Sequence, residues 1–499
     1  MILIKYIGIK DFEYDIQGLI RSFFPGEKMV TDKETSARLT LITDICEENI
    51  SLMLEEQSDI IDKASCEICR EDRKDTKNRL KRLVYELLSS YTGKTLPWGT
   101  LSGIRPTKIT TALLKEGKNV PWIKQYMESE YYLSDEKTQL SIGISQRELK
   151  ILESIDYENG YSIYIGIPFC PSTCSYCSFT SYPLAAYKDK VDAYIDALCR
   201  EIHFVGERFR EKKLNTIYIG GGTPTTLEPY QMERLLGEIE NTFDLSYVRE
   251  FTVEAGRPDS ITPDKLKIMV EHNVTRISVN PQTMNEKTLK LIGRNHTVEQ
   301  IHEAFGMARS AGFDNINMDF IVGLPQESIE DVRYTMEEVK KIHPDSITIH
   351  SLAVKRAAKL NTQKEEFEEY SYVNDSAIMN MTAKYAQEMG MQPYYLYRQK
   401  NMTGNMENVG YAVPDKAGIY NILIMEEKQS IVALGAGAAS KMVFSAEKFS
   451  QEIFPVGKFP MGKKIHRIEN VKDVDCYISR INEMIGRKAK FLDKYGQIL

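Results

Sequence analysis

The stretch YSIYIGIPFCPSTCSYCSFTSYP, residues Tyr161–Pro183, decides the fold and carries three of the eight cysteines of the chain. Cys170, Cys174 and Cys177 follow each other in a C-x3-C-x2-C spacing, directly after the alternating, strand-like run Tyr161–Ile167. Thiolates on one short loop can each bind a different iron of a [4Fe–4S] cluster, and three of them leave one iron open for chemistry. The alternative is a group of structural or zinc-bound thiols, although zinc sites usually show paired cysteines or a nearby histidine. We therefore predict an iron–sulfur cluster on this loop.

Beyond the loop, short apolar or alternating runs each precede a helical stretch. With Tyr161–Ile167 as the first strand, the others are expected at Thr216–Gly220, Phe251–Glu254, Arg276–Val279, Ile316–Ile321 and Ser346–His350. The helices are expected at Asp189–Phe209, Tyr230–Phe243, Thr262–His272, Val298–Ala311 and Glu327–Ile342. Six strands alternating with helices predict a parallel sheet with right-handed crossovers. In barrel-like folds of this class the active site lies at the C-terminal ends of the strands.

We expect three domains, at residues 1–155, 156–354 and 355–499. The first is an α+β domain, with strands and helices expected at Ile2–Tyr6, Leu39–Ile45, Phe12–Phe24, Asp72–Ser90 and Ser134–Ser154. The second holds the strand–helix repeat. The third is mixed and mainly helical, and its helix at Asp375–Glu388 is followed by Gly390, which suits a helix C-terminus.

The bulk composition excludes several classes of function. The net charge of −7 gives no broad attraction to nucleic acid or anionic lipid, so we expect neither as a partner. No apolar run approaches the roughly 20 residues that span a membrane, and the N-terminal apolar run is too short for a signal peptide. Eight cysteines in 499 residues are not a disulfide framework, and a cysteine-bound cluster needs reducing conditions. We expect a cytoplasmic protein.

Unusual residues follow the predicted strands. The sequence GGGTP, residues 220–224, ends the second strand, and glycines there let a ligand approach bare backbone. Glu254 closes the third strand, where a carboxylate suits ribose hydroxyls or an ammonium group. Asp319 lies in the otherwise apolar fifth strand, where an acid is costly unless it is paired or binds a ligand. A buried ion pair between Asp319 and Arg294 is the alternative to a ligand site.

On the cysteine spacing, the I-P-F-C and C-x-Y-C details and the GGGTP turn, the sequence resembles the radical S-adenosylmethionine (SAM) superfamily. The resemblance extends from Tyr161 to about Ser440 and points to the branch of oxygen-independent coproporphyrinogen III dehydrogenases, haem chaperones and anaerobic haem-degrading enzymes. The long N-terminal region with LSGIRPTK is similar to the longer HemZ-type branch. The resemblance implies a partial (β/α)6 barrel, and a cluster whose open iron holds SAM and cleaves it to a 5′-deoxyadenosyl radical.

The resemblance also implies site residues. The cluster-bound SAM would contact Tyr164, Gly221 and Glu254. A second SAM-sized site would be lined by Tyr176, Gly222, Thr223, Gln282, Arg294, Asp319 and Ala353. Ala439 is a looser match to a contact with the first SAM. The implied substrate is a tetrapyrrole and the implied electron donor a flavodoxin or ferredoxin, and we expect a monomer.

Three functions stay open at this stage. The first hypothesis is oxidative decarboxylation of coproporphyrinogen III to protoporphyrinogen IX in haem biosynthesis. The others are a haem-binding chaperone and a radical SAM methyltransferase that opens the haem ring. Two departures from the family pattern bear on the choice, because many members carry histidine at Gly166 and the established dehydrogenases carry a fourth cysteine at Phe179.

Further residues carry weaker signals. Arg105 and Lys108 could bind a substrate carboxylate or form interdomain salt bridges. Cys66 and Cys69 form a CxxC without a second pair nearby, which favours surface thiols over a metal site. An aromatic and basic group suits either a lid over a flat tetrapyrrole bearing carboxylates or core packing, and it comprises Tyr394, Tyr395, Tyr397 and Arg398.

Overall fold

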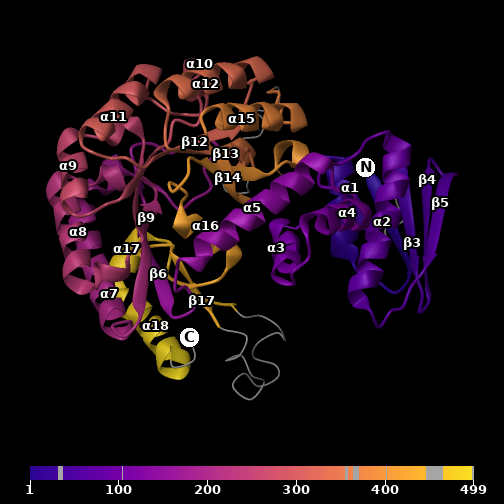
Figure 1. Ribbon diagram of the computed structural model, residues 1–499, viewed down its shortest axis with the longest axis horizontal. Coiled ribbons are helices and arrows are strands. Elements are labelled where there is room, and N and C mark those ends of the chain that lie inside the picture. The colour runs from indigo at the N-terminus through magenta and orange to yellow at the C-terminus, as the bar shows by residue number, and fades with distance from the viewer. Residues whose placement is uncertain are drawn as a thin grey trace. The chain divides into compact units, whose positions relative to one another are not determined.

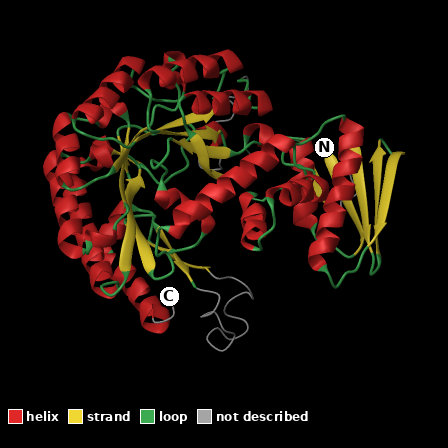
Figure 2. Cartoon of the chain, viewed as in Figure 1, coloured by secondary structure: helices red, strands yellow, loops and turns green. Residues whose placement is uncertain are grey.

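The computed structural model describes residues 1–31, 37–103, 105–354, 358–362, 370–399, 402–444 and 465–496. The chain forms two compact units, shown in Figures 1 and 2. The first comprises Met1–Gln146 and Arg398–Asn405, and the second comprises Arg147–Tyr397 and Met406–Leu499. None of the helices in the described part of the chain combines the length and apolar character that crossing a bilayer requires.

The first unit is a five-stranded sheet covered by helices, with strand order β2-β1-β3-β4-β5. Its elements are β1 (Ile2–Gly8), α1 (Glu13–Phe23), β2 (Met29–Thr31), β3 (Leu39–Ile45), β4 (Asn49–Glu56), β5 (Asp59–Glu67) and α2 (Arg73–Thr92). The sequence predicted β1, α1, β3 and α2, and these are confirmed. The hairpin of β4 and β5 was not predicted, because β5 is largely exposed and lacks an apolar face. The apolar faces of α1, α2 and the sheet form one core.

Three more helices follow in the chain: α3 (Thr107–Lys115), α4 (Val120–Tyr131) and α5 (Asp135–Glu153). The predicted helix at Ser134–Ser154 is confirmed by α5. Thr110 of α3 joins α5 through hydroxyl hydrogen bonds to Ser141 (3.0 Å) and Ser145 (2.7 Å). Arg105 and Lys108 lie at the start of α3, and their role stays a prediction. No described group with Cys66 or Cys69 could hold a metal ion.

The second unit is built on six parallel strands, as predicted. They are β6 (Gly160–Ile167), β9 (Lys213–Gly221), β10 (Glu250–Gly256), β11 (Arg276–Val279), β12 (Ile316–Val322) and β13 (Ser346–Ser351). They lie in the sheet in chain order, and an arc of helices covers their outer side (Figure 1). These helices are α7 (Val191–Arg208), α8 (Pro229–Thr242), α9 (Pro263–Glu271), α10 (Glu286–Leu291), α11 (Val298–Ser310) and α12 (Ile329–Ile342). The five crossover helices that the sequence predicted are confirmed, and the short α10 is an addition.

Residues after 354 extend the same sheet at both edges. At one edge, β15 (Asn408–Ala412) pairs antiparallel with β13, and β14 (Gln392–Tyr397) pairs antiparallel with β15. Beside β6 lies the parallel strand β16 (Ser430–Leu434), followed by β17 (Ala439–Val443) and β18 (Ile465–Glu469). The helices here are α15 (Ser376–Glu388), α16 (Ile419–Glu426), α17 (Val474–Ser479) and α18 (Ile481–Tyr495). The helix predicted at Asp375–Glu388 is confirmed, while the domain boundaries at 155 and 355 stay predictions.

The parallel strands alternate between aliphatic and polar or aromatic side chains. Strand register pairs Tyr164 with Tyr218, Glu254 with Ser278 and Asp319 with Thr348. Paired residues of neighbouring strands point to the same side of a sheet. The polar and aromatic set therefore shares one side, which we call the inner face, and the aliphatic set packs under the helices. Tyr420 of α16 stacks on Tyr218 with ring centroids 4.4 Å apart, so α16 covers part of the inner face.

Candidate active site

The three predicted cluster ligands lie on the loop after β6, at the C-terminal ends of the parallel strands. Cys170 ends the short strand β7 (Phe169–Cys170), which pairs with β8 (Tyr182–Pro183) and closes the loop on itself. The backbone N–H of Cys177 donates to the carbonyl of Cys174 (3.2 Å). All three residues are free thiols, and the pairing of β7 with β8 holds them within one short turn of chain.

The cysteine loop is anchored from two sides. Arg257, only 3% exposed, donates Nη1 to the hydroxyl of Ser172 (2.7 Å) and pairs with Asp259 (2.7 Å). From the other side, the backbone N–H of Ser175 donates to the carbonyl of Ile292 (3.0 Å). Because these partners come from the segments after β10 and α10, the barrel itself fixes the position of the loop.

The loop fits a [4Fe–4S] cluster. Burial, with a smaller contribution from the neighbouring Cys177 and Cys174 sulfurs, raises the pKa of the Cys170 thiol to about 11. A bound metal reverses this tendency, because a coordinating thiol is deprotonated. Among the described residues, no histidine or acid joins these cysteines in a group that could hold a metal ion. In a cubane cluster each cysteine binds a different iron, which suits three thiols spread along one loop.

The glycine turn that ends β9 packs directly against the cysteine loop. The backbone N–H groups of Gly222 and Thr223 donate to the carbonyls of Ile167 (2.8 Å) and Phe169 (2.7 Å). The Thr223 hydroxyl lies 3.6 Å from the Cys170 sulfur. A Cβ atom at Gly222 would lie 2.5 Å from the carbonyl oxygen of Phe169, a contact that no side chain makes. Glycine is therefore required for the backbone to approach the cluster site.

Tyr164 and Glu254 flank the same turn. Gly221 adopts a φ of 110°, and a Cβ atom there would lie 3.2 Å from the Tyr164 hydroxyl. Glu254 accepts hydrogen bonds from the Tyr218 hydroxyl and from the backbone N–H of Gly221. Burial raises the pKa of Glu254 to about 7 despite these hydrogen bonds. The structure thus brings Tyr164, Gly221 and Glu254 together, and their contact with SAM stays a prediction.

The raised pKa of Glu254 predicts a pH effect on stability. Between its ordinary pKa of 4.5 and about 7, the folded state holds a proton that the unfolded state has released. Stability of the SAM-free protein therefore falls as pH rises through this window, and Glu254→Gln removes that loss. From pH 5 to pH 8 the variant is expected to gain up to about 3 kcal/mol relative to wild type.

Urea unfolding of both proteins at each pH measures this difference. Burial also raises the pKa of Glu327 to about 7, but that group is the same in both proteins and cancels. A difference between the two proteins that stays constant from pH 5 to pH 8 would contradict the prediction.

Arg294 and Tyr176 form a second group beside the cysteines. Arg294 is 6% exposed, hydrogen-bonds the Tyr176 hydroxyl and the Cys174 sulfur, and donates to the carbonyl of Asn280. The structure therefore does not show the alternative ion pair with Asp319. Arg294 instead links the cysteine loop to the segment after β11.

Asp319 faces a different partner. Its Oδ1 lies 3.9 Å from Nε2 of His350 and accepts a hydrogen bond from the Asn317 amide (2.7 Å). Burial alone would raise the pKa of Asp319, but His350 and Asn317 lower it below its ordinary value. Gln282 donates its backbone N–H to the Asp319 carbonyl (3.0 Å) and adopts a φ of 74°. A non-glycine residue in this region is strained, and such strain often marks a functional site.

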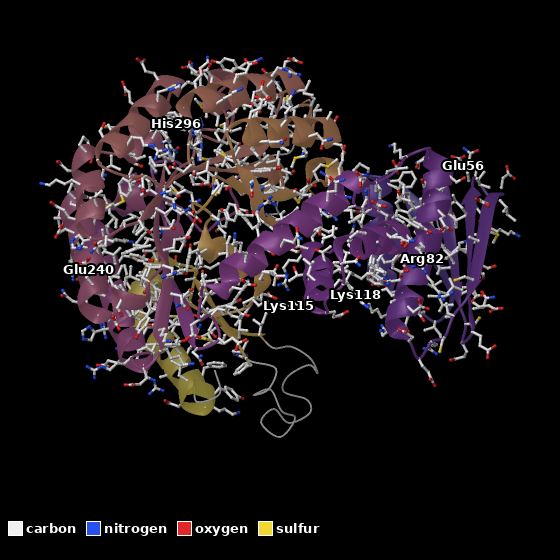
Figure 3. All side chains as sticks on the ribbon, viewed as in Figure 1. Glu56, Arg82, Lys115, Lys118, Glu240 and His296 are labelled. Carbon is white, nitrogen blue, oxygen red and sulfur yellow. The ribbon has the colours of Figure 1, made fainter. Side chains whose placement is uncertain are left out.

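Several buried polar atoms near these strand ends have no hydrogen-bond partner within the described residues. They are Ser175 Oγ, Ser278 Oγ, Asn280 Oδ1, Arg294 Nε and both ring nitrogens of His296. Figure 3 labels His296. Burial lowers the pKa of His296 to about 4, helped by the nearby Arg294 charge, so this ring is neutral. Buried polar atoms are almost always paired in folded proteins. The unpaired polar atoms at this edge therefore fit a polar ligand.

Two predicted residues lie at the margins. Ala353 is half-buried and follows β13, next to Leu352, which packs in a cluster with Tyr176. Ala439 is exposed and begins β17, just after a turn that reaches β6. In that turn a Cβ atom at Gly435 would lie 2.5 Å from the carbonyl oxygen of Gly166. The roles of both alanines stay predictions.

The aromatic and basic group around β14 resolves mainly toward core packing. Tyr394 and Tyr395 are 2% and 5% exposed and belong to a hydrophobic core cluster. Arg398 belongs to the first unit, where its guanidinium lies 5.5 Å from the Trp98 ring centroid and donates to the Asn405 side chain (2.8 Å). A lid role for these three residues finds no support. Tyr397 is half-buried and faces His350.

Sequence reasoning missed three residues of the site: Arg257, Tyr218 and His350. Tyr218 and His350 occupy the alternate positions of β9 and β13 that share the inner face, so a period-2 reading could have found them. Arg257 has no sequence signal, because its role depends on a loop that is distant in the chain.

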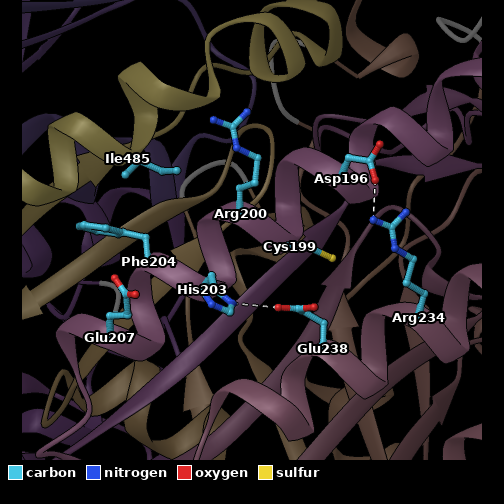
Figure 4. Close-up of a pocket in the computed structure, with 9 residues that line it drawn as sticks. All are labelled: Asp196, Cys199, Arg200, His203, Phe204, Glu207, Arg234, Glu238 and Ile485. Atoms are coloured by element: carbon cyan, nitrogen blue, oxygen red, sulfur yellow. Dashed lines mark hydrogen bonds and ion pairs between the residues drawn. The ribbon is translucent and has the colours of Figure 1, made fainter.

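A surface hollow of about 600 Å³ lies on the outer helices α7, α8 and α18, on the opposite side of the sheet from the inner face (Figure 4). It is lined by Asp196, Cys199, Arg200, His203, Phe204, Glu207, Arg234, Glu238 and Ile485. Burial raises the pKa of the Cys199 thiol to about 11, which disfavours the nucleophilic thiolate at neutral pH. The hollow is separate from the predicted site.

Comparisons with known proteins agree with this arrangement. Residues 164–339 match the family model of the radical SAM superfamily. The oxygen-independent coproporphyrinogen-III oxidase-like protein HemZ of Bacillus subtilis (strain 168) is 39% identical over 429 residues, which cover 85% of this chain and 83% of HemZ. The chain belongs to the radical SAM superfamily, in the family that includes HemZ. As a member, it uses a [4Fe–4S] cluster and SAM.

Two further matches place this radical SAM protein within the family. The heme chaperone HemW of Lactococcus lactis subsp. lactis (strain IL1403) is 39% identical over 191 residues, 38% of this chain and 48% of that protein. The match therefore spans about half the length of the chaperone. The structure of coproporphyrinogen III oxidase (HemN) from Escherichia coli is similar with a TM-score of 0.50 and 21% identity, over 68% of this chain and 73% of that one. The fold is thus the radical SAM fold. The proteins that this chain resembles include both an oxidase and a chaperone.

Proposed function

We propose that this protein is an oxygen-independent coproporphyrinogen III dehydrogenase, which forms protoporphyrinogen IX in haem biosynthesis. The observation that carries the proposal is the junction of the cysteine loop and the glycine turn at the strand ends, in a chain similar to HemZ over most of both lengths. In the reaction, each of two propionate side chains loses a hydrogen atom from its β-carbon, one electron and CO2, and becomes a vinyl group. A one-electron acceptor takes the electron.

The residues would divide the work as follows. Cys170, Cys174 and Cys177 hold the cluster, and together with SAM the cluster supplies the one-electron chemistry that removes the hydrogen atom. Tyr164 and Glu254 orient the SAM bound at the cluster, with Gly221 giving it access to backbone. The inner face keeps water from the reacting atoms, because tyrosine rings cover part of it.

A second SAM would serve the second propionate. The residues proposed for its site are Tyr176, Gly222, Thr223, Gln282, Arg294, Asp319 and Ala353, with Ala439 at the first SAM. The unpaired polar atoms beside Arg294 support a polar ligand there. A flavodoxin or ferredoxin is the proposed electron donor for the cluster.

A haem chaperone is the second candidate function. The observation that favours it is Phe179, which stands where the established dehydrogenases carry a fourth cysteine and is 70% exposed. The match to HemW points the same way. A chaperone would bind haem stably and release no CO2.

An anaerobic assay of the reconstituted protein with dithionite, SAM and coproporphyrinogen III tests the proposal. Mass spectrometry is expected to find protoporphyrinogen IX formed in step with 5′-deoxyadenosine. If 5′-deoxyadenosine forms while the porphyrinogen is unchanged, the dehydrogenase assignment fails. Stable haem binding would then support the chaperone, and a methylated, ring-opened product from haem would support a methyltransferase.

A further inference from the structure

His350 lies at the C-terminal end of β13, on the same side of the sheet as Asp319. Its side chain is 26% exposed and that of Asp319 is 24% exposed. The flanking residues Ile349 and Ser351 are only 0% and 3% exposed. The imidazole and the carboxylate therefore border open space on the inner face, at the end of the strands where active sites of this fold lie.

The two ring nitrogens of His350 face different groups. Nε2 lies 3.9 Å from Oδ1 of Asp319, and Nδ1 lies 3.4 Å from the Tyr397 hydroxyl. Asp319 is ionised, because its pKa is lowered by His350 and by the amide of Asn317. A carboxylate behind an imidazole orients the ring and stabilises its charged form. The second nitrogen is thereby directed toward Tyr397.

Nδ1 of His350 and the Tyr397 hydroxyl form a pair of hydrogen-bonding groups 3.4 Å apart. In its charged form the imidazole carries an N–H on both nitrogens, so a ligand carboxylate, which only accepts hydrogen bonds, can bridge Nδ1–H of His350 and the Tyr397 O–H. Both present contacts are longer than well-formed hydrogen bonds, and contacts in a ligand-free site often tighten only when the ligand arrives. Asp319 and Glu254, the acids near His350, offer no N–H, so the imidazole is the side chain beside them that can donate to an anion.

We propose that His350 and Tyr397 bind one carboxylate of the substrate, with Asp319 orienting His350 from behind. This rests on the proposed function, in which the carboxylate is a propionate of the tetrapyrrole. The Tyr397 ring lies nearly parallel to that of the buried Tyr395, at 13° and 6.2 Å, so core packing fixes the ring that carries the donor hydroxyl. The methionine carboxylate of SAM offers the same chemistry and is the other source to be tested.

Binding measurements on the full-length, cluster-reconstituted protein test this assignment. Coproporphyrin III, the stable oxidised ring with the same four propionates, is titrated and its fluorescence recorded, in parallel with its tetramethyl ester. His350→Ala is expected to weaken coproporphyrin III binding roughly 10- to 100-fold, the effect of losing a hydrogen bond to a charged group. Ester binding is expected to stay unchanged. Tyr397→Phe should weaken binding less, because it removes a neutral donor.

Two further variants make the test specific. His350→Gln keeps a donor of similar size and is expected to restore part of the affinity, which a purely structural role would not explain. His302→Ala is the matched control, because His302 also faces a carboxylate, that of Glu338 at 3.7 Å, but lies on the outer helix α11. This control is expected to bind coproporphyrin III as the wild type does.

The possible results distinguish a failure of the His350 assignment from a failure of the proposed dehydrogenase function. Equal binding of coproporphyrin III by wild type and His350→Ala overturns the role of His350 and leaves the proposed function intact. If equilibrium dialysis shows that the variant loses SAM but keeps the porphyrin, the propionate assignment is overturned. If the wild type binds neither porphyrin, the proposed function fails, and the propionate assignment fails with it.

Discussion

Replacing Cys170 by alanine is expected to abolish cluster binding and to reduce 5′-deoxyadenosine formation to background. Three thiols are the full protein ligand set of the proposed cluster, so a variant with two cannot hold it in place. The remaining anchors of the loop, Arg257 with Ser172 and the pairing of β7 with β8, do not involve the Cys170 side chain. The apoprotein should therefore stay folded, with its free energy of unfolding within about 1 kcal/mol of wild type.

Iron and sulfide content, visible absorption of the reconstituted protein and 5′-deoxyadenosine yield measure this effect. Cys199→Ser is the matched control, because Cys199 is a partly buried free thiol on α7, on the other side of the sheet. The control is expected to retain a full cluster. A complete cluster in Cys170→Ala would show that another residue completes the ligand set.

Replacing Lys488 by methionine is expected to destabilise the protein by about 3–5 kcal/mol. Lys488 of α18 and Glu201 of α7 form an ion pair at 2.7 Å, with side-chain exposures of 1% and 0%. Glu201 also accepts hydrogen bonds from the Tyr477 hydroxyl (2.7 Å) and the backbone N–H of Gly435 (2.9 Å). Methionine fills a similar volume but leaves the carboxylate buried without its counter-charge.

Denaturant unfolding followed by circular dichroism measures this loss. The control is Lys190→Met, because Lys190 pairs with Asp475 at the same distance of 2.7 Å but with exposures of 42% and 56%. That exposed pair contributes about 0–1 kcal/mol. A loss below about 1 kcal/mol in Lys488→Met would show that the buried carboxylate finds its compensation elsewhere.

The sequence predicts the parallel barrel well because two signals coincide there. Each strand is a short apolar or alternating run, and the crossover helices are amphipathic, as α7 and α12 are. The sequence fails at β5, an exposed edge strand, and at β14 to β18, which join the sheet through the distant pairings of β15 with β13 and of β16 with β6. The spacing of hydrophobic residues indicates which face of a segment is buried, but it does not indicate which other segment packs or pairs with it.

The site residues likewise divide into those with a local sequence signal and those placed by distant parts of the chain. The cysteines and the glycine turn are recognisable because their chemistry needs a fixed local spacing. Arg257, which holds the cysteine loop, has no such spacing, and the pairing of Asp319 with His350 depends on the register of β12 against β13. Arg398 suits either a lid over the substrate or core packing by its neighbours in sequence, and in the structure it packs on Trp98 in the first unit. Proximity along the chain was a poor guide where the chain leaves one unit for the other.

The pairing of β16 with β6 has a consequence for biosynthesis. Ser162 of β6 donates its hydroxyl hydrogen to Gln429, which precedes β16 and lies 267 residues later in the chain. At about 5–20 residues per second, the ribosome needs roughly ten seconds to a minute to make that stretch. During this time the strand that leads into the cysteine loop has one open edge. Iron–sulfur insertion on a finished scaffold must therefore wait until Gln429 and β16 have been translated, long after the three cysteines themselves.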